Sequence, residues 1–509
     1  MAAFQRAILG MASAVLLLAS GPADAAWRRA ETDHFILYGE IEEGRLREQA
    51  IVLEEFDRLL RLLTGVDAAS PPNKLPVYLV YNHDRLRLVR DVSYGVGGFY
   101  LASPDGIGAF VNQRTNVGRY GPNDTLFHEY AHHFMLQYFP AGYPAWYVEG
   151  FAEYVATADF RSDILEFGRY NDNRSLWLSD KSRWIPYEHV LFGGDRKPQW
   201  GDSARFYAQS WILVHYLMSD PARAAATRAY LSALSAGEEP RTAFQSAFGM
   251  PASDLDARIR AYARDGIAYT RAPRGHAVAD PVITTLPTSS DELMLLQAVM
   301  RVGVPEKARK AVLERTRREA RGKEDPFARR VLAQAEALYG NAAAADRLLG
   351  ELLQASPDDA ELLYLKGMRY LTAGRADEAA RAAYFAEAKG WFVKAHKVDP
   401  NHFPTLYRYA EALSVEPDYL SENTTNILLL ARSLAPQVAE IGIQAGQILL
   451  LREEYDAARA VLTPIAASVH HPQSVAAAET LLEAAKNRRP VDERVGFDFG
   501  DAEQAGSTE

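Results

Sequence analysis

Three histidines and one glutamate lie within six residues of a single apolar segment, TLFHEYAHHFMLQYFP, at residues 125–140. If this segment is an α-helix, His128 and His132 lie on one face, because residues four apart are stacked one turn above the other. Their two imidazoles can then bind one metal ion. Glu129 follows His128 directly, where its carboxylate can reach a water molecule on that ion. The spacing is the HExxH pattern, which combines two zinc ligands with a general base.

The alternative interpretation is a buried amphipathic helix that contains histidine by chance. The segment also holds the apolar residues of a core face, namely Leu126, Phe127, Tyr130, Phe134, Met135 and Tyr138. Two imidazoles and a carboxylate are nevertheless costly to bury without partners, and a metal ion is a natural partner. His133 lies about 100° around the helix from His132. We expect it to take no part in the site.

A catalytic zinc usually takes three protein ligands and keeps its fourth position for water. The segment YPAWYVEGFAEYVA, residues 143–156, is a second predicted helix, and its Glu149 follows His132 by seventeen residues. Proline and glycine between the two segments break the chain, so that the second helix can fold back across the first. Glu149 is therefore the expected third ligand. Glu153, one turn further on, is suited to accept a hydrogen bond from a ligating imidazole and to fix its tautomer.

Two other kinds of zinc site are excluded by the sequence. The pattern HExxHxxGxxH would require glycine at position 135 and histidine at position 138, where this chain has Met135 and Tyr138. The metzincin class is therefore excluded. The chain contains no cysteine, which also excludes a Cys-ligated metal site, a thiolate nucleophile and a disulfide framework.

The motifs HEYAH and WYVEGFAEY together resemble the gluzincin superfamily of zinc metallopeptidases. Within it, the aminopeptidase-N-like enzymes carry a similar Trp-x-x-Glu-Gly-Phe-Ala stretch. The thermolysin-like enzymes place an acidic residue four positions after the glutamate ligand, where Glu153 stands here. The resemblance implies one Zn²⁺ per chain, with His128, His132 and Glu149 as ligands and Glu129 as the general base.

A third segment, RFYAQSWILVHYL at residues 205–217, resembles the part of the aminopeptidase-N-like enzymes that carries an oxyanion-binding tyrosine. The resemblance implies that role for Tyr207; the alternative is a core aromatic. We expect His215 to be a core histidine. The Gly-x-Met-Glu-Asn strand with which those aminopeptidases bind the substrate amino terminus is absent, so their exopeptidase specificity does not carry over. The amino-terminal layout resembles peptidase-MA-like domains of bacterial proteins, and we expect an endopeptidase.

The pattern of the amino-terminal half predicts an α+β domain. Residues 26–120 alternate strand-like runs with helical patterns and end in a predicted hairpin at 97–112, around the turn Pro104-Asp105-Gly106. We expect this hairpin to add an extended peptide by β-augmentation. Helical patterns dominate residues 121–270, where the zinc site is expected. The resemblance implies that residues 26–270 form a thermolysin-like, peptidase-MA-like catalytic domain.

The pattern of the carboxy-terminal half predicts an all-α solenoid. Residues 271–289 are rich in proline and are expected to form a linker, and residues 290–487 resemble degenerate tetratricopeptide repeats. Such helix pairs stack into a solenoid with a concave surface that binds protein partners. The segment YFAEAKGWFVKA is interpreted as an insertion within one repeat, and residues 488–509 as a disordered tail. Prolines precede four predicted helices at spacings of 43, 36 and 36, at Pro357, Pro400, Pro436 and Pro472.

The first 25 residues have the layout of a secretory signal peptide: one arginine, a short apolar run and a small-residue cleavage site. The alternative is an uncleaved membrane anchor. No later segment predicts a membrane span, so a periplasmic or secreted protein is expected. The net charge of −10 and the absence of a long basic run argue against nucleic acid as a partner.

The sequence therefore predicts a periplasmic or secreted zinc metallopeptidase whose helical repeats recruit a protein substrate or partner. One alternative is an inactive peptidase-like scaffold that acts as a binding module. Another is a zinc hydrolase that acts on a non-peptide amide or ester of the cell envelope. The presence of every expected catalytic residue argues against the inactive scaffold. The envelope hydrolase uses the same residues as the peptidase, so the sequence does not separate these two.

Overall fold

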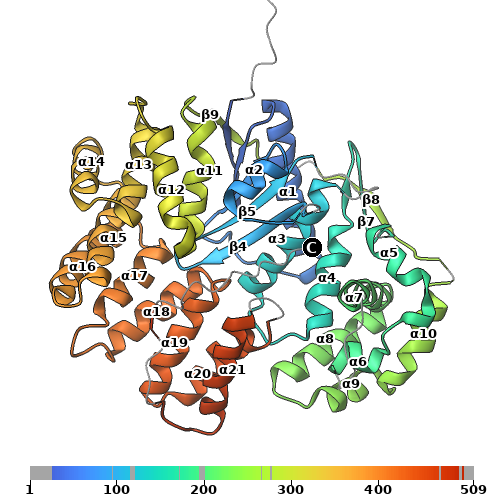
Figure 1. Ribbon diagram of the computed structural model, residues 1–509. Helices are drawn as coiled ribbons and strands as arrows, with labels where there is room; N and C mark the ends of the chain where they lie inside the picture. The colour runs from blue at the N-terminus through green and yellow to red at the C-terminus, as the bar shows by residue number, and fades with distance from the viewer. Residues whose placement is uncertain are drawn as a thin grey trace, which may run out of the picture.

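The computed structural model is mostly helical, with one large sheet near the amino terminus (Figure 1). The predicted signal peptide, residues 1–25, lies outside the residues that the structure describes. Among the described helices, none has both the length and the apolar character needed to cross a bilayer. The described residues are 26–93, 96–114, 121–170, 172–193, 201–264, 266–275, 278–468, 472–491 and 496–497.

Six strands form the large sheet in the order β4-β5-β3-β2-β1-β9. The pairs β2–β3 and β3–β5 are parallel, and the other three neighbouring pairs are antiparallel. The predicted hairpin is confirmed as β4 and β5, joined at the turn after Ser103. The strands are β1 (Arg28–Glu31), β2 (Phe35–Gly39), β3 (Leu75–Val80), β4 (Gly98–Ser103), β5 (Gly106–Asn112) and β9 (Val282–Thr285).

Helices cover both faces of this sheet. As a result, side chains that alternate along its central strand, β3, are buried in two different cores. Val77 and Leu79 belong to the core that α1 (Glu43–Thr64) and α3 (Pro122–Tyr138) close. The core on the opposite face contains Tyr78 and Val80. This second core is closed by α2 (His83–Val89) and α11 (Ser290–Val302). The first helix of the predicted repeat region thus completes the core of the amino-terminal sheet.

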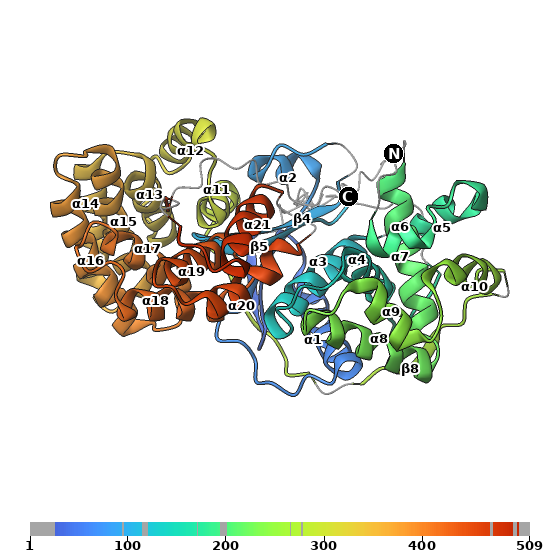
Figure 2. The same ribbon diagram turned by 90° about the horizontal axis from the view of Figure 1, so that it is seen from below.

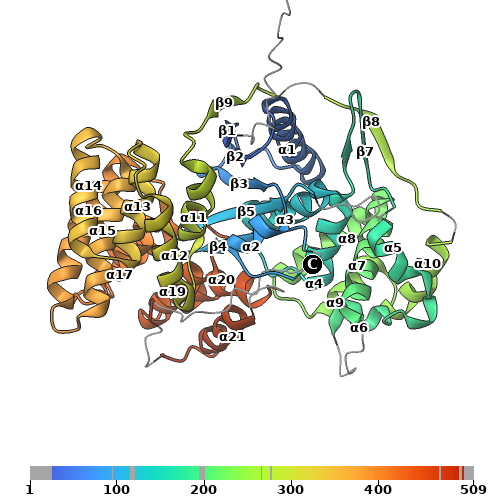
Figure 3. The ribbon, with the colours of Figure 1, turned by 45° about the horizontal axis from the view of Figure 1, so that its top comes forward.

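The helical part that follows the sheet is organised around α4 (Ala145–Ala156) and α7 (Asp202–Met218), which pack closely against each other. A three-stranded sheet with the order β6-β7-β8 lies at its side (Figure 3). These strands are β6 (Asp159–Phe160), β7 (Ile164–Phe167) and β8 (Thr270–Pro273). The remaining elements are α5 (Asp172–Ser179), α6 (Tyr187–Phe192), α8 (Pro221–Ser235), α9 (Pro240–Phe248), α10 (Leu255–Tyr262) and 3-10 turns at Lys181–Arg183 and Ala252–Asp254.

The predicted linker at residues 271–289 is not an irregular connection. Strand β8 pairs with β7, and β9 pairs with β1 at the edge of the large sheet. Both strands are four residues long. Such short strands have little periodicity of their own, and they form because an existing sheet edge offers unpaired backbone groups. Pro273 is tolerated because it ends an edge strand.

The carboxy-terminal region is a stack of helix pairs, as the proline spacing predicts. Pro357, Pro400 and Pro436 each precede the start of a helix by three residues, and Pro472 is the first residue of the last helix. The segment interpreted as an insertion is part of one long helix, α16 (Arg381–Val398). The extra seven residues of that repeat are two helical turns, which leaves the packing face unchanged. The helices are α12 (Glu306–Glu319), α13 (Pro326–Tyr339), α14 (Ala342–Ala355), α15 (Ala360–Ala376), α16 (Arg381–Val398), α17 (Phe403–Leu413), α18 (Glu422–Leu434), α19 (Ala439–Leu451), α20 (Tyr455–Ala466) and α21 (Pro472–Lys486).

The repeats leave the sheet at α11, run outward to α16 and return beneath β4, where α18 to α21 come close to α3 (Figures 1 and 2). Ala102 of β4 belongs to the same core as the helices from α17 onward. Asp105, in the turn after β4, lies 2.6 Å from Arg408 of α17. Part of the predicted disordered tail is also in contact with the repeats, since the ring of Phe497 lies 5.4 Å from that of Tyr407.

Candidate metal centre

The HEYAH segment forms the middle of α3, as predicted. Pro122 occupies the first turn, and the Asp124 carboxylate accepts a hydrogen bond from the backbone N–H of Gly121 at 2.5 Å. Both features favour a helix start at this point. His128 and His132 then lie in the buried part of the helix, with exposures of 2% and 6%.

The two imidazoles and the Glu149 carboxylate converge on one point. The Nε2 atoms of His128 and His132 are 3.0 Å apart, and Glu149 Oε2 lies 3.5 Å from each of them. Zinc bonds of about 2.1 Å at tetrahedral angles place donor atoms about 3.4 Å apart. Two imidazole nitrogens and one carboxylate oxygen are also a donor set that zinc accepts. The group His128, His132 and Glu149 therefore has the chemistry and the spacing to hold a metal ion.

Glu149 reaches this point because α4 packs tightly between α3 and α7. The next residue, Gly150, makes the packing possible, since a methyl group there would overlap the backbone carbonyl oxygen of Ser210 in α7. A glycine directly after the glutamate is thus a requirement of the helix packing that positions the ligand.

Replacing Gly150 by alanine is expected to lower the free energy of unfolding by roughly 1–3 kcal/mol, because the added methyl group must displace helix backbone. Thermal unfolding followed by circular dichroism measures the effect. Gly390→Ala in α16 is the matched control, because nothing lies within 4 Å of a methyl group there; it should stabilise the helix by a few tenths of a kcal/mol up to about 1 kcal/mol. Equal stability of the Gly150→Ala protein and the native chain would refute this account of the packing.

Glu153 lies behind the metal group, at the position predicted for a residue that orients an imidazole. Its Oε1 atom is 3.4 Å from Nδ1 of His128 and accepts a hydrogen bond of 2.6 Å from Arg174. Both carboxylate and guanidinium are buried, with exposures of 3% and 7%. An Arg–Glu–His chain of this kind fixes the ring orientation of a ligand. The sequence offers no spacing rule that would single out Arg174, which comes from the separate helix α5.

Tyr207 lies near the metal group on α7, and its ring centroid is 6.5 Å from that of His128. The central carbon of the Arg174 guanidinium lies over the Tyr207 ring, 5.1 Å from its centroid. Tyr207 therefore contacts the same arginine that pairs with Glu153. Tyr207 is partly exposed. Its position is compatible with the role that the sequence predicts.

The other two histidines of this part lie outside the metal group. His215 is a core histidine, as expected: its Nε2 lies 2.6 Å from the carbonyl oxygen of Gly168 and its Nδ1 lies 2.8 Å from the Tyr262 hydroxyl. His133 has more contacts than expected, because its Nδ1 is 2.8 Å from the hydroxyl of Tyr100 in β4. Burial lowers the pKa of His133 to about 3, so it is neutral at physiological pH.

A small cavity of about 70 Å³ lies beside the metal group. Glu129 and His132 line it from α3, and Tyr100 and Ala102 line it from β4. Burial and the charge of Glu129 hold the pKa of Tyr100 well above its usual range. The opposite wall comes from the repeats, with Arg432, Pro436, Gln437, Ala439, Pro464, Ile465, Ser468, Ser474 and Val475. The repeats therefore contribute residues to the lining of the candidate site. This contribution could not be predicted from the sequence.

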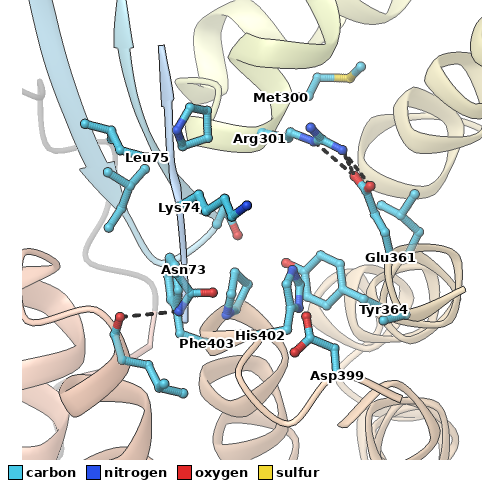
Figure 4. Close-up of a pocket in the computed structure, with 18 of the residues that line it drawn as sticks. Asn73, Lys74, Leu75, Met300, Arg301, Glu361, Tyr364, Asp399, His402 and Phe403 are labelled. Carbon is cyan, nitrogen blue, oxygen red and sulfur yellow. Dashed lines mark hydrogen bonds and ion pairs between the residues drawn. The ribbon is translucent and has the colours of Figure 1, made fainter. Parts of the chain in front are cut away.

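A larger cavity of about 430 Å³ lies between the sheet and the repeats (Figure 4). His133 lines this cavity, whereas Glu129 and His132 line the small one. Charged residues at its rim are paired within the protein: Arg301 lies 2.5 Å from Glu361, and Lys74 lies 2.7 Å from the carboxylate of Glu31 in β1. Helix α3 contributes side chains to both cavities, and the predicted general base Glu129 lines the small one. Tyr207, the other predicted catalytic residue, is not among the described residues that line either cavity.

Comparison with known proteins adds little to this picture. No protein-family model matches the chain, and no curated protein matches it. Among solved structures it is similar to a thermophilic TPR protein of Thermus thermophilus, with 16% sequence identity and a TM-score of 0.32. That match covers 38% of this chain and 99% of the other. The description of the carboxy-terminal region as helical repeats rests on its own helix pairs.

Proposed function

We propose that this chain is a zinc-dependent metallopeptidase of the gluzincin type, with a thermolysin-like catalytic domain. The observation that carries the proposal is the convergence of the His128, His132 and Glu149 donor atoms within 4.8 Å of one another. A carboxylate that can act as a base, Glu129, and a buried carboxylate behind one ligand, Glu153, complete the arrangement. A buried amphipathic helix without a metal gives no reason for this convergence.

A zinc ion held by these three residues would lower the pKa of its water towards about 7 and polarise the scissile carbonyl. Glu129 would act as the general base that accepts a proton from the attacking water and delivers it to the leaving amine. Tyr207 donates a hydrogen bond to the oxygen that gains negative charge. Glu153 and Arg174 keep the His128 ring in the orientation that directs Nε2 towards the metal position.

We propose a peptide or protein as the substrate, cut within the chain. Strand β4 supplies Tyr100 and Ala102 to the small cavity, so a strand of substrate that pairs with β4 would pass beside Glu129. The repeats, which also line the cavity, would present the substrate or a protein partner to the site. We propose that this activity lies in the periplasm or outside the cell, which the predicted signal peptide supports.

Metal analysis and a proteolysis assay on the same sample test this function. The purified chain is expected to contain one zinc per molecule and to cut a mixed unfolded-protein substrate at internal bonds, identified by mass spectrometry. A chelator should stop the cleavage, and added zinc should restore it. Absence of zinc would favour the scaffold alternative. Zinc together with activity only on a non-peptide amide or ester would favour the envelope-hydrolase alternative.

Replacing Glu153 by glutamine is expected to weaken zinc binding by about 10- to 100-fold, because glutamine keeps the shape but loses the charge behind His128. A competition titration with a zinc-binding dye measures the change. Glu166→Gln is the matched control: Glu166 is buried to 5% exposure and lies within 4 Å of Arg161, Arg169 and Arg271, away from the metal group. If both variants changed zinc affinity equally, Glu153 would have no specific role.

A further inference from the structure

The repeats bring one cation to the small cavity beside the metal group. Arg432 lies in the last turn of α18 and lines the same cavity as Glu129 and His132. Apart from Gln437, the other residues that the repeats contribute to the cavity lining are apolar or carry a hydroxyl group. Arg432 is therefore the only positively charged side chain among the described residues that line this cavity.

Arg432 has no acidic partner within the described parts of the chain. Burial alone lowers its pKa to about 10, and no neighbouring carboxylate raises it again. A cation withdrawn from water costs free energy unless an anion pairs with it. The position of Arg432 next to a cavity leaves room for an anion that the protein itself does not supply.

Two other partly buried arginines of the repeat region have such an anion. Arg301 lies 2.5 Å from Glu361, and Arg375 lies 2.6 Å from Glu411. Burial acts to lower the pKa of each of these arginines, but the carboxylates reverse the effect and leave it raised. Arg432 departs from this pattern, and it does so where the repeats meet the candidate catalytic residues.

Two features of the surrounding structure bear on the position of Arg432. A methyl group on Gly442 of α19 would lie 3.0 Å from a guanidinium nitrogen of Arg432, so the glycine leaves room for the side chain. Five residues after Arg432, the Gln437 amide donates hydrogen bonds to the backbone oxygen of His133 at 3.2 Å and to the Gln137 side chain at 3.1 Å. The chain just after α18 is thus hydrogen-bonded to α3, the helix that carries two of the three proposed metal ligands.

We propose that Arg432 binds a carboxylate of the peptide substrate beside the metal group, so that the helical repeats make the enzyme selective for anionic peptides. A guanidinium pairs with a carboxylate through two parallel hydrogen bonds, which gives both affinity and orientation. A cavity of about 70 Å³ suits a group of this size better than a large side chain. The inference rests on the proposed peptidase function. The carboxylate is that of the substrate's carboxy terminus or of an aspartate or glutamate side chain.

Four matched peptides separate these two sources. They share one sequence and differ in a free or amidated carboxy terminus, and in glutamate or glutamine at one internal position. Cleavage rates are measured for the native chain, Arg432→Met and Arg432→Lys. Arg459→Met in α20 is the control, because Arg459 is exposed on the same repeats. Binding of the labelled peptides to the Glu129→Gln protein is measured in parallel by fluorescence anisotropy, with and without Arg432→Met.

The native chain should prefer one kind of carboxylate peptide over its neutral partner by about tenfold or more in kcat/KM and in affinity. Arg432→Met should reduce that ratio to below about twofold, Arg432→Lys should keep part of it, and Arg459→Met should leave it unchanged. If a variant contains less folded protein, its rates on both peptides of a pair fall by the same factor, so the ratio of the two rates does not change. Preference for the free terminus assigns the terminal carboxylate, and preference for glutamate assigns the side chain.

Cleavage without a charge preference, or a preference that survives Arg432→Met, would overturn the inference and leave the peptidase proposal intact. Absence of all cleavage, combined with Arg432-dependent binding of a carboxylate peptide to the Glu129→Gln protein, would overturn the peptidase proposal and support the anion site. Absence of both cleavage and binding would overturn both.

Discussion

Replacing Glu129 by glutamine is expected to lower peptide hydrolysis by roughly 10³-fold, because the amide cannot accept the proton of the attacking water. Glutamine has nearly the shape of glutamate, so the helix and the two neighbouring histidines should keep their positions. Zinc content should stay at one per chain. The measurement is kcat/KM on a fluorogenic peptide, together with metal analysis of the same sample.

Glu378→Gln is the control for this experiment, since Glu378 is an exposed carboxylate of the repeats, and it should retain the native rate. A Glu129→Gln protein with native activity and bound zinc would show that another group acts as the base. Loss of zinc along with activity would mean that Glu129 helps to hold the metal. Either outcome would require a different assignment of the carboxylates around His128 and His132.

A chain that runs from residue 26 and ends at Thr288 is expected not to fold. It lacks α11, whose side chains close the core on one face of the large sheet. Burying six large apolar side chains contributes roughly 9–18 kcal/mol, which equals or exceeds the whole stability of a typical domain. The six are Leu293, Met294, Leu296, Val299, Met300 and Val302. Circular dichroism and thermal unfolding should show no cooperative transition, and the soluble yield should be low.

The control is a chain that ends at residue 497, which keeps every described residue and should unfold as the full chain does. Supplying residues 289–509 as a separate chain should rescue part of the soluble yield, because the missing helix then returns. Cooperative unfolding of the fragment 26–288 by itself would show that the sheet does not need α11. The region before residue 289 would then fold independently of the repeats, in line with the catalytic domain predicted at residues 26–270.

The local part of the candidate site could be predicted from the sequence. His128 and His132 share a face because of helix periodicity, and Glu149 lies on the next helix after a short break, so the three come together through a helix hairpin that is close in the chain. The hairpin at residues 97–112 could be predicted for the same reason. Each of these features depends on turn chemistry and periodicity over a few tens of residues.

The distant parts could not be predicted in this way. Arg174 pairs with Glu153 from a separate helix, and no spacing in the sequence relates the two. Gln437 and Arg432 reach the site only because the repeats curve back beneath β4, and that curvature depends on helix packing along the whole solenoid. The strands within 271–289 are too short to produce a pattern; they exist because the edges of finished sheets accept them.

The pairing of β1 with β9 has a consequence for the order in which the molecule assembles. Arg28 is opposite Thr285, so the last edge of the sheet closes only after more than half of the chain is available. Contacts between such distant residues form slowly, because the loop between them must first lose its freedom. Until then β1 exposes backbone groups that can pair with other molecules. Helix α11 follows β9 directly and completes the core of the sheet, whereas the outer wall of the small cavity comes from residues 432–475. A newly made chain that has reached α11 would therefore hold the metal group while its outer wall is still absent.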